Sequence, residues 1–148
     1  MIQDHYVVPK VDGVTGNHHN LSHHGQDGDK IKQLQKIERE IIGCFGSLVG
    51  QMKSKSESGS TLLDNTSILF GSNLGNANAH HARNLPIFLA GGGFKHGQFV
   101  QKKNGTPFYR TINQNTKRNA RRGPFRLLVV EFEARRWEFF IESISSSI

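Results

Sequence analysis

The sequence predicts an α/β fold in which a small sheet is flanked by helices. Three observations support this prediction: one long amphipathic helical pattern after residue 29, two short apolar runs at residues 66–70 and 85–90, and 16 glycines in 148 residues. Short strands that are apolar throughout, beside a long helix, are typical of a sheet covered by helices. The many glycines favour frequent turns.

A long helix is predicted first along the chain. Residues 1–29 are polar, rich in Gly and His and without periodicity, which predicts a loop, and Asp27 and Asp29 stand where helix N-caps belong. From Lys30 to about Met52, apolar residues recur every three or four positions and define one helical stripe: Ile31, Leu34, Ile37, Ile41, Phe45, Leu48 and Met52. Cys44, the single cysteine, has apolar neighbours and is expected to be buried.

Two strands are predicted after a Ser/Lys/Gly linker at residues 53–60. The run from Thr66 to Phe70 ends at Gly71, and the run at 85–90 contains Pro86, which suits a strand start or edge. Asp64 is expected to cap the turn before the first strand. The glycine triplet at 91–93 lacks the Lys-Ser/Thr ending of a phosphate-binding loop, so it predicts a tight strand exit.

The formal net charge of +7 lies entirely in the last third of the chain. Residues 95–148 hold eleven basic and four acidic residues, whereas the charges of residues 1–94 cancel. Aromatic residues among these charges would suit single-stranded nucleic acid. Residues 126–132 read equally as an ordinary strand, so a nucleic-acid partner is not favoured. No apolar run approaches the roughly 20 residues that a membrane-spanning helix needs.

The densest chemical feature is a histidine cluster, in which four of the eight histidines lie within residues 18–24. Neutral imidazole is a common ligand of zinc and similar ions and a good proton carrier near neutral pH. His19 and His23 would share a face if this stretch were helical. The alternative is a histidine-rich surface loop whose rings bracket the backbone.

A second feature is the loop from Ser72 to His81, which follows the first predicted strand. In α/β folds, ligands gather at the loops after the carboxyl ends of strands. The loop could supply a ligand or an orienting amide through Asn73, Asn76, Asn78, His80 and His81. The alternative is that its Gly and Asn residues simply turn the chain.

Three stretches, taken in order, resemble the HXXSHH family, a bacterial domain family without an established function that is found chiefly in planctomycetes. They are HNLSHH at residues 19–24, the stretch from Thr61-Leu62-Leu63-Asp64-Asn65 to His80, and the stretch from Asn84-Leu85-Pro86-Ile87 to the glycine triplet. The later two are also similar to the metal-binding end of the alkaline phosphatase and sulfatase superfamily.

The resemblance implies a secreted or periplasmic protein whose partial alkaline-phosphatase-like sheet is a fragment of a larger domain. It implies a divalent metal at the strand ends, with His19, His23 and His24 as the first candidate ligands and His80 as the next. The natural reaction class would be metal-assisted hydrolysis of a phosphate or sulfate ester. Ser22 has no identified base partner, and the superfamily's nucleophile is expected upstream of this chain.

Two departures from the resembled pattern keep a second reading open. Ser72-Asn73 stands where metal-dependent members carry an acidic residue, and neutral Asn is a poorer ligand. After Pro107 a basic run replaces the expected apolar helix, so residues 1–107 form the HXXSHH part and residues 108–148 a divergent basic tail. A shifted reading frame is the hypothesis for this tail. The alternative function is a non-catalytic envelope or carbohydrate-associated binding protein.

Overall fold

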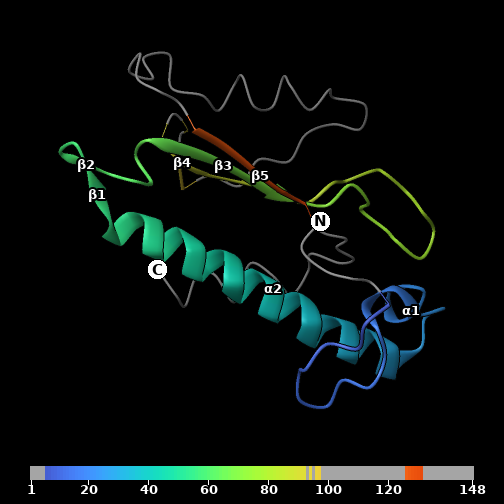
Figure 1. The fold of residues 1–148 in the computed structure, drawn as a ribbon. Coiled ribbons are helices and arrows are strands. Elements are labelled where there is room, and N and C mark those ends of the chain that lie inside the picture. The colour runs from blue at the N-terminus through green and yellow to red at the C-terminus, as the bar shows by residue number, and fades with distance from the viewer. Residues whose placement is uncertain (1–5, 93, 95, 98–125, 132–148) are drawn as a thin grey trace. The chain divides into compact units, whose positions relative to one another are not determined.

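The computed structural model describes residues 6–92, 94, 96 and 97, and the backbone of residues 126–131. The mixed α/β class is confirmed, because helices and strands both occur along these ranges (Figure 1). The elements in chain order are α1 (His18–Ser22), α2 (Gly28–Ser54), β1 (Ser56–Glu57), β2 (Ser60–Thr61), β3 (Thr66–Gly71), β4 (Ile87–Gly91) and β5 (Arg126–Glu131).

The strands form two sheets. Strands β1 and β2 make an antiparallel ribbon whose turn contains Ser58 and Gly59, both at positive φ (52° and 83°), so the predicted linker at 53–60 is in part a hairpin. The other sheet has the order β4-β3-β5, with β3 in the middle (Figure 1). The strand interpretation of residues 126–132 is therefore confirmed for the backbone of β5.

The contacts of the described residues divide into two units. Residues 6–42, 71–86 and 131 form the first, here named the histidine unit, and the described residues of 43–70 and 87–130 form the second, here named the sheet unit. Helix α2 contributes residues 28–42 to the histidine unit and residues 43–54 to the sheet unit. The predicted boundary between residues 107 and 108 lies outside the described residues.

The core of the histidine unit comes from the predicted helical stripe. Leu34 and Ile37 of α2 are buried with Leu21 of α1, and Val14 and Ile41 pack against them. On the opposite side of the helix Lys32, Lys36 and Arg39 are exposed, while Glu38 is half-buried. The spacing of three and four residues therefore identifies the buried face of this part of α2 correctly.

The core of the sheet unit is aromatic. Phe45 of α2 stacks on Phe70 of β3, with ring centroids 4.4 Å apart and an interplanar angle of 8°. Phe88 of β4 lies 6.0 Å from both rings. Cys44 is exposed, contrary to expectation, because one residue turns a helix by about 100° and carries it off the face that Phe45 occupies.

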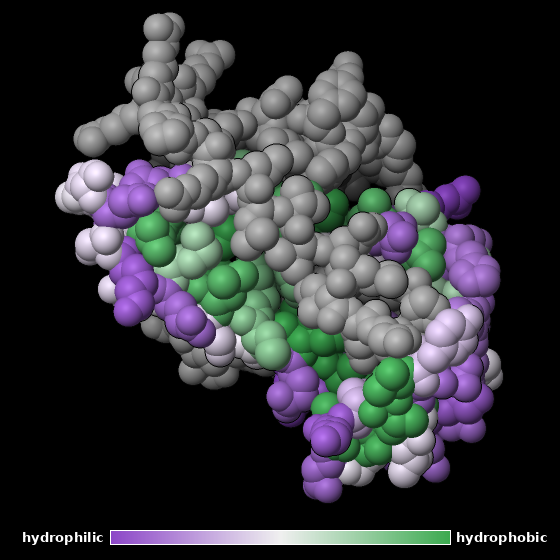
Figure 2. All heavy atoms as spheres, in the orientation of Figure 1, coloured by the Kyte–Doolittle hydropathy of each residue, from purple (hydrophilic) through white to green (hydrophobic). Residues whose placement is uncertain are grey.

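Apolar side chains also remain on the surface of the histidine unit. Tyr6, Val7, Val8 and Leu85 are exposed, and Figure 2 shows hydrophobic surface among hydrophilic residues on the face it displays.

Within the described ranges, no helix combines the length and the apolar character needed to cross a bilayer.

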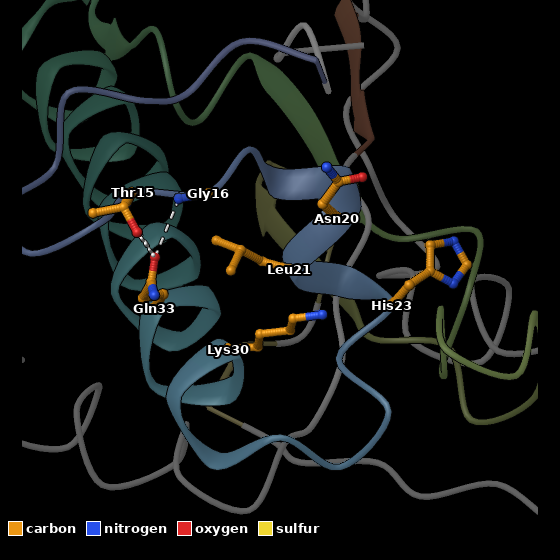
Figure 3. A pocket seen from close by; sticks show the side chains of 7 residues that line it. All are labelled: Thr15, Gly16, Asn20, Leu21, His23, Lys30 and Gln33. Carbon is orange, nitrogen blue, oxygen red and sulfur yellow. Dashed lines mark hydrogen bonds between the residues drawn. The ribbon is translucent and has the colours of Figure 1, made fainter.

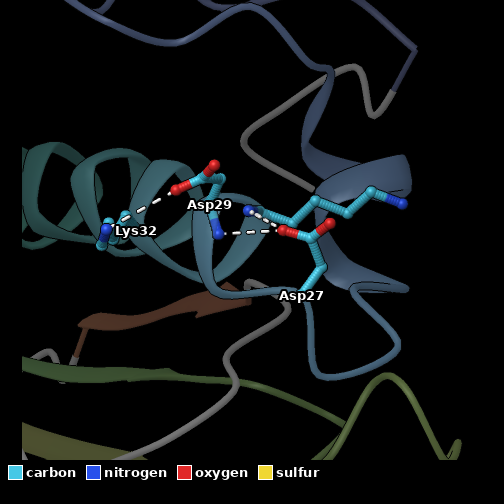
Figure 4. Close-up of polar contacts among 4 residues, drawn as sticks. Asp27, Asp29 and Lys32 are labelled. Atoms are coloured by element: carbon cyan, nitrogen blue, oxygen red, sulfur yellow. Dashed lines mark hydrogen bonds and ion pairs between the residues drawn. The ribbon is translucent and has the colours of Figure 1, made fainter.

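Asp27 caps the N-terminus of α2, as the sequence predicts. Its Oδ1 accepts hydrogen bonds from the backbone N–H groups of Asp29, at 2.9 Å, and Lys30, at 3.1 Å (Figure 4). These bonds, the one from Lys30 first, lower the pKa of the Asp27 carboxyl below its ordinary value of 3.8. Asp29 is not the cap but lies in the first turn, where it forms an exposed ion pair with Lys32 at 3.5 Å.

We expect the Asp27 cap to make helix stability depend on pH. Because its pKa is lowered on folding, the ionised carboxylate stabilises the fold above pH 3.8, and this contribution is lost as pH falls through the lower folded pKa. Urea unfolding followed by circular dichroism at about pH 7 and about pH 2.5 should show that Asp27→Ala loses more stability relative to wild type at the higher pH than at the lower. The exposed Asp12→Asn variant is the control, and an equal loss at both pH values would contradict the expectation.

The exit from β4 is a close backbone approach. Gly91 has φ +92°, and a Cβ atom at Gly92 would overlap the carbonyl oxygen of Asp64. The Gly92 N–H donates to the carbonyl oxygens of Leu63, at 2.8 Å, and Thr66, at 2.9 Å. Asp64 itself caps the preceding turn as predicted, since its Oδ2 accepts from the Thr61 N–H at 3.1 Å. The predicted tight strand exit is confirmed, because Gly92 packs closely against the backbone of the turn before β3 and its N–H is hydrogen-bonded to that turn.

We expect Gly92→Ala to lower the free energy of unfolding by about 2–3 kcal/mol, because the backbone of Asp64 leaves no room for a methyl group. The matched control is Gly46→Ala in α2, where a Cβ would meet nothing within 4 Å. That change should raise stability by about 0.5–1 kcal/mol through helix propensity alone. Denaturant unfolding of both variants checks the pair, and an unaffected Gly92→Ala would disprove the close approach.

Candidate functional site

The HXXSHH segment contains a short helix, which corrects the prediction of a loop at residues 18–22. The Asn17 side chain caps α1 by accepting from the Asn20 N–H at 2.8 Å, and the N–H of His23 closes the helix on the His19 carbonyl at 3.2 Å. His18 and Leu21 are buried on its inner side. Five residues are too few to show a periodic pattern, and the Asn17 cap was the available signal.

Ser22 has a structural role in this helix. Its side chain is buried, with 1% relative exposure, and its hydroxyl donates to the His19 carbonyl oxygen at 2.8 Å. A serine nucleophile needs a base within hydrogen-bond reach and an accessible oxygen. The Ser22 hydroxyl is buried and bonded to the backbone of its own helix.

The predicted loop after β3 is closed twice by backbone hydrogen bonds. The Ser72 N–H donates to the Pro86 carbonyl oxygen at 3.1 Å, and Asn76 pairs with His81 as an antiparallel bridge. Between them the His80 N–H donates to the Ala77 carbonyl oxygen at 3.3 Å, and His80 has φ +49°. This left-handed backbone is uncommon outside glycine and asparagine, and it fixes the direction in which the loop presents His80.

The loop and the HXXSHH segment meet within the histidine unit. The Asn78 Oδ1 accepts a hydrogen bond from the Gly25 N–H at 3.1 Å, across 53 positions of sequence. The rings of His23 and His80 lie edge to face, with centroids 5.0 Å apart. Asn78 thus ties the loop to the backbone of the motif.

Three of the four predicted site residues form a continuous line of rings. His19 lies 4.8 Å from His23, and His23 lies 5.0 Å from His80, so we name His19, His23 and His80 the histidine row. Tyr6 extends the line, with its ring 6.0 Å from that of His19. The sequence points to these three histidines but carries no signal for Tyr6, whose neighbours carry no motif.

His24 takes a different role from the other candidates. Its Nδ1 accepts a hydrogen bond from the Gln26 N–H at 2.9 Å, next to a left-handed backbone at Gln26, where φ is +70°. The ring thus supports the turn that leads into α2. For His24 this matches the alternative reading, in which histidine brackets the loop backbone.

The histidine row suits a divalent ion in its chemistry but does not present a complete set of ligands. Two imidazoles on one zinc ion place their ring centroids about 5 Å apart, the spacing of neighbouring rings in the row. Among the described residues, however, no group of three or more His, Cys, Asp or Glu side chains is arranged to hold an ion. Because His23 contacts both neighbours, a metal site here would depend on His23 first.

Comparison with protein-family models, curated proteins and solved structures finds no match to this chain. The resemblance to the HXXSHH family and to the alkaline phosphatase and sulfatase superfamily therefore stays a prediction. The candidate site rests on the ring contacts of the histidine row and on the Asn78 hydrogen bond.

We expect Asn78→Ala to release the loop from the motif, at a stability cost of about 0.5–1 kcal/mol for one exposed hydrogen bond. The Gly25 amide should then exchange with solvent faster, as hydrogen exchange measured by NMR would show. Asn78→Asp keeps the accepting oxygen and should retain protection. The control is Asn73→Ala in the same loop, an exposed residue, and equal exchange in all four proteins would disprove the tie.

Proposed function

We propose that this chain is the C-terminal part of an exported bacterial HXXSHH-family protein, and that its histidine row binds a divalent metal ion. The observation that supports this most is the contact between His23 of the motif and His80 of the distant loop. A solvated surface loop gives no reason for two histidine segments to meet ring to ring. A shared ligand does, because imidazoles bind one ion from neighbouring positions.

The related reaction would be hydrolysis of a phosphate or sulfate ester. A bound divalent ion supplies Lewis-acid polarisation of an ester oxygen and makes bound water more acidic. The contribution of this chain is orientation: α1 carries His19 toward His23, and the Asn78 hydrogen bond holds His80 on the other side. The nucleophile is proposed to come from the upstream part of the family domain.

The alternative is a non-catalytic binding protein of the cell envelope, associated with carbohydrate. Two observations favour it. The Ser22 hydroxyl is buried and bonded to backbone, and Asn73, at the position expected for an acidic ligand, is exposed. A protein that keeps the fold but lacks an acidic ligand and a nucleophile would retain ligand binding alone. A nucleic-acid partner is not proposed.

The metal proposal is tested by elemental analysis of the purified chain. We expect close to one equivalent of zinc, manganese or calcium in wild type, and its loss in His23→Ala/His24→Ala and in His23→Ala alone, because His23 joins the two halves of the row. His80→Ala should weaken metal affinity about tenfold or more. His81→Ala is the matched control, since His81 is the exposed neighbour of His80 and its ring lies outside the row.

Circular dichroism of each variant shows whether its fold is retained. A folded wild-type chain that holds no metal after incubation with each ion would contradict the metal proposal and favour the binding protein. Equal loss in His81→Ala would show that the ion is not bound by the row. If metal is bound, ester hydrolysis that disappears in His23→Ala separates the hydrolase relative from the binding protein.

A further inference from the structure

A hollow of about 460 Å³ lies in the histidine unit, between α1 and the first turns of α2. Its walls come from Thr15, Gly16, Asn20, Leu21, His23, Lys30 and Gln33 (Figure 3). Lys30 runs beneath Leu21 with its ammonium group directed toward the side of His23 (Figure 3). Among the described residues that line this hollow there is no carboxylate, and Lys30 supplies their formal charge.

Gln33 has a fixed orientation in the hollow. Its Oε1 accepts three hydrogen bonds, from the Thr15 N–H at 2.8 Å, the Thr15 hydroxyl at 3.3 Å and the Gly16 N–H at 3.2 Å. Because the three bonds identify the oxygen, the other end of the amide is the NH₂ group, which can only donate. The segment that enters α1 therefore holds a donor in place at the wall.

The Lys30 ammonium makes no ion pair with any described residue. Asp27 precedes Lys30 by three residues, and its pKa is lowered first by the backbone hydrogen bonds from Lys30 and Asp29, with the charge of Lys30 as a smaller cause. The Asp27 carboxylate is engaged at the helix cap, where its Oδ1 takes two N–H groups. A cation without a close carboxylate, beside amide donors, favours an anionic ligand.

We propose that this hollow binds a small oxyanion, the group shared by phosphate, sulfate and carboxylate ligands. Lys30 supplies the opposite charge, the NH₂ groups of Gln33 and Asn20 donate hydrogen bonds, and Leu21 forms the apolar side of the hollow. The inference goes beyond the proposed metal site and does not require it, because a metal ion takes no part in these contacts. The two sites share one residue, His23, which lies in the row and at the edge of the hollow.

The test is an NMR titration of the full ¹⁵N-labelled chain with sodium phosphate in the presence of a chelator. Sodium sulfate and sodium acetate form parallel arms that separate the possible sources of the oxyanion. Sodium chloride at matched ionic strength controls for general screening. We expect saturable shifts of the Thr15, Gly16, Asn20 and Gln33 amides, with a dissociation constant of about 1–10 mM for so small a ligand.

Two variants test the assignment of the hollow. Lys30→Gln removes the charge from an exposed side chain and should weaken binding about tenfold. Gln33→Glu keeps an accepting oxygen for Thr15 and Gly16 while it replaces the donor by a negative charge, so binding should disappear without loss of the fold. The matched control is Lys32→Gln. It removes the same charge from an exposed lysine of the same helix that does not line the hollow, so this variant should bind as wild type does.

The proposal is overturned if the shifts do not saturate, if chloride reproduces them, or if Lys30→Gln binds as tightly as wild type. Equal weakening in Lys32→Gln would assign the effect to net charge and not to the hollow. Metal content measured on Lys30→Gln keeps the two proposals apart. If Lys30→Gln retains metal but loses oxyanion binding, both proposed sites are supported. If wild type binds the oxyanion but holds no metal, the oxyanion proposal stands and the metal proposal is contradicted.

Discussion

The apolar stripe of α2 is the constraint on which the described structure depends. Leu34 and Ile37 from the first part of the helix build the core of the histidine unit, and Phe45 from the second part stacks in the core of the sheet unit. Because the stripe repeats every three or four residues, a shift of one position would remove apolar side chains from both cores at once. The Asp27 cap fixes where the helix begins and so helps to set this register.

Sequence reasoning predicts the fold well where the pattern is long or the turn chemistry is specific. The α2 stripe, the strand that ends at Gly71 and the glycine exit after β4 all follow from spacing and residue type. It fails where the signal is short or decided by a single residue. Helix α1 is one turn long, the hairpin at 56–61 has two-residue strands, and Cys44 is exposed although its neighbours are apolar.

The candidate site shows the same division. The sequence points to His19, His23 and His80 because histidine is rare and chemically distinctive, and the structure brings these three into one row. It does not show that His24 supports a turn, because this depends on the direction of its ring toward the Gln26 N–H. Nor does it show the hollow, whose walls come from a loop and two helices and follow only from packing.

The hydrogen bond between Asn78 and Gly25 closes a chain segment of 53 positions, which has a consequence for the order of folding. A long-range contact stabilises the chain only after its two ends have come together. The loss of chain entropy on closing the loop therefore comes before the gain from the contact. Local elements such as α1 and the 76–81 turn need no such closure. The histidine row should therefore assemble late, so a chain can contain native secondary structure while the chemistry of the row is still absent.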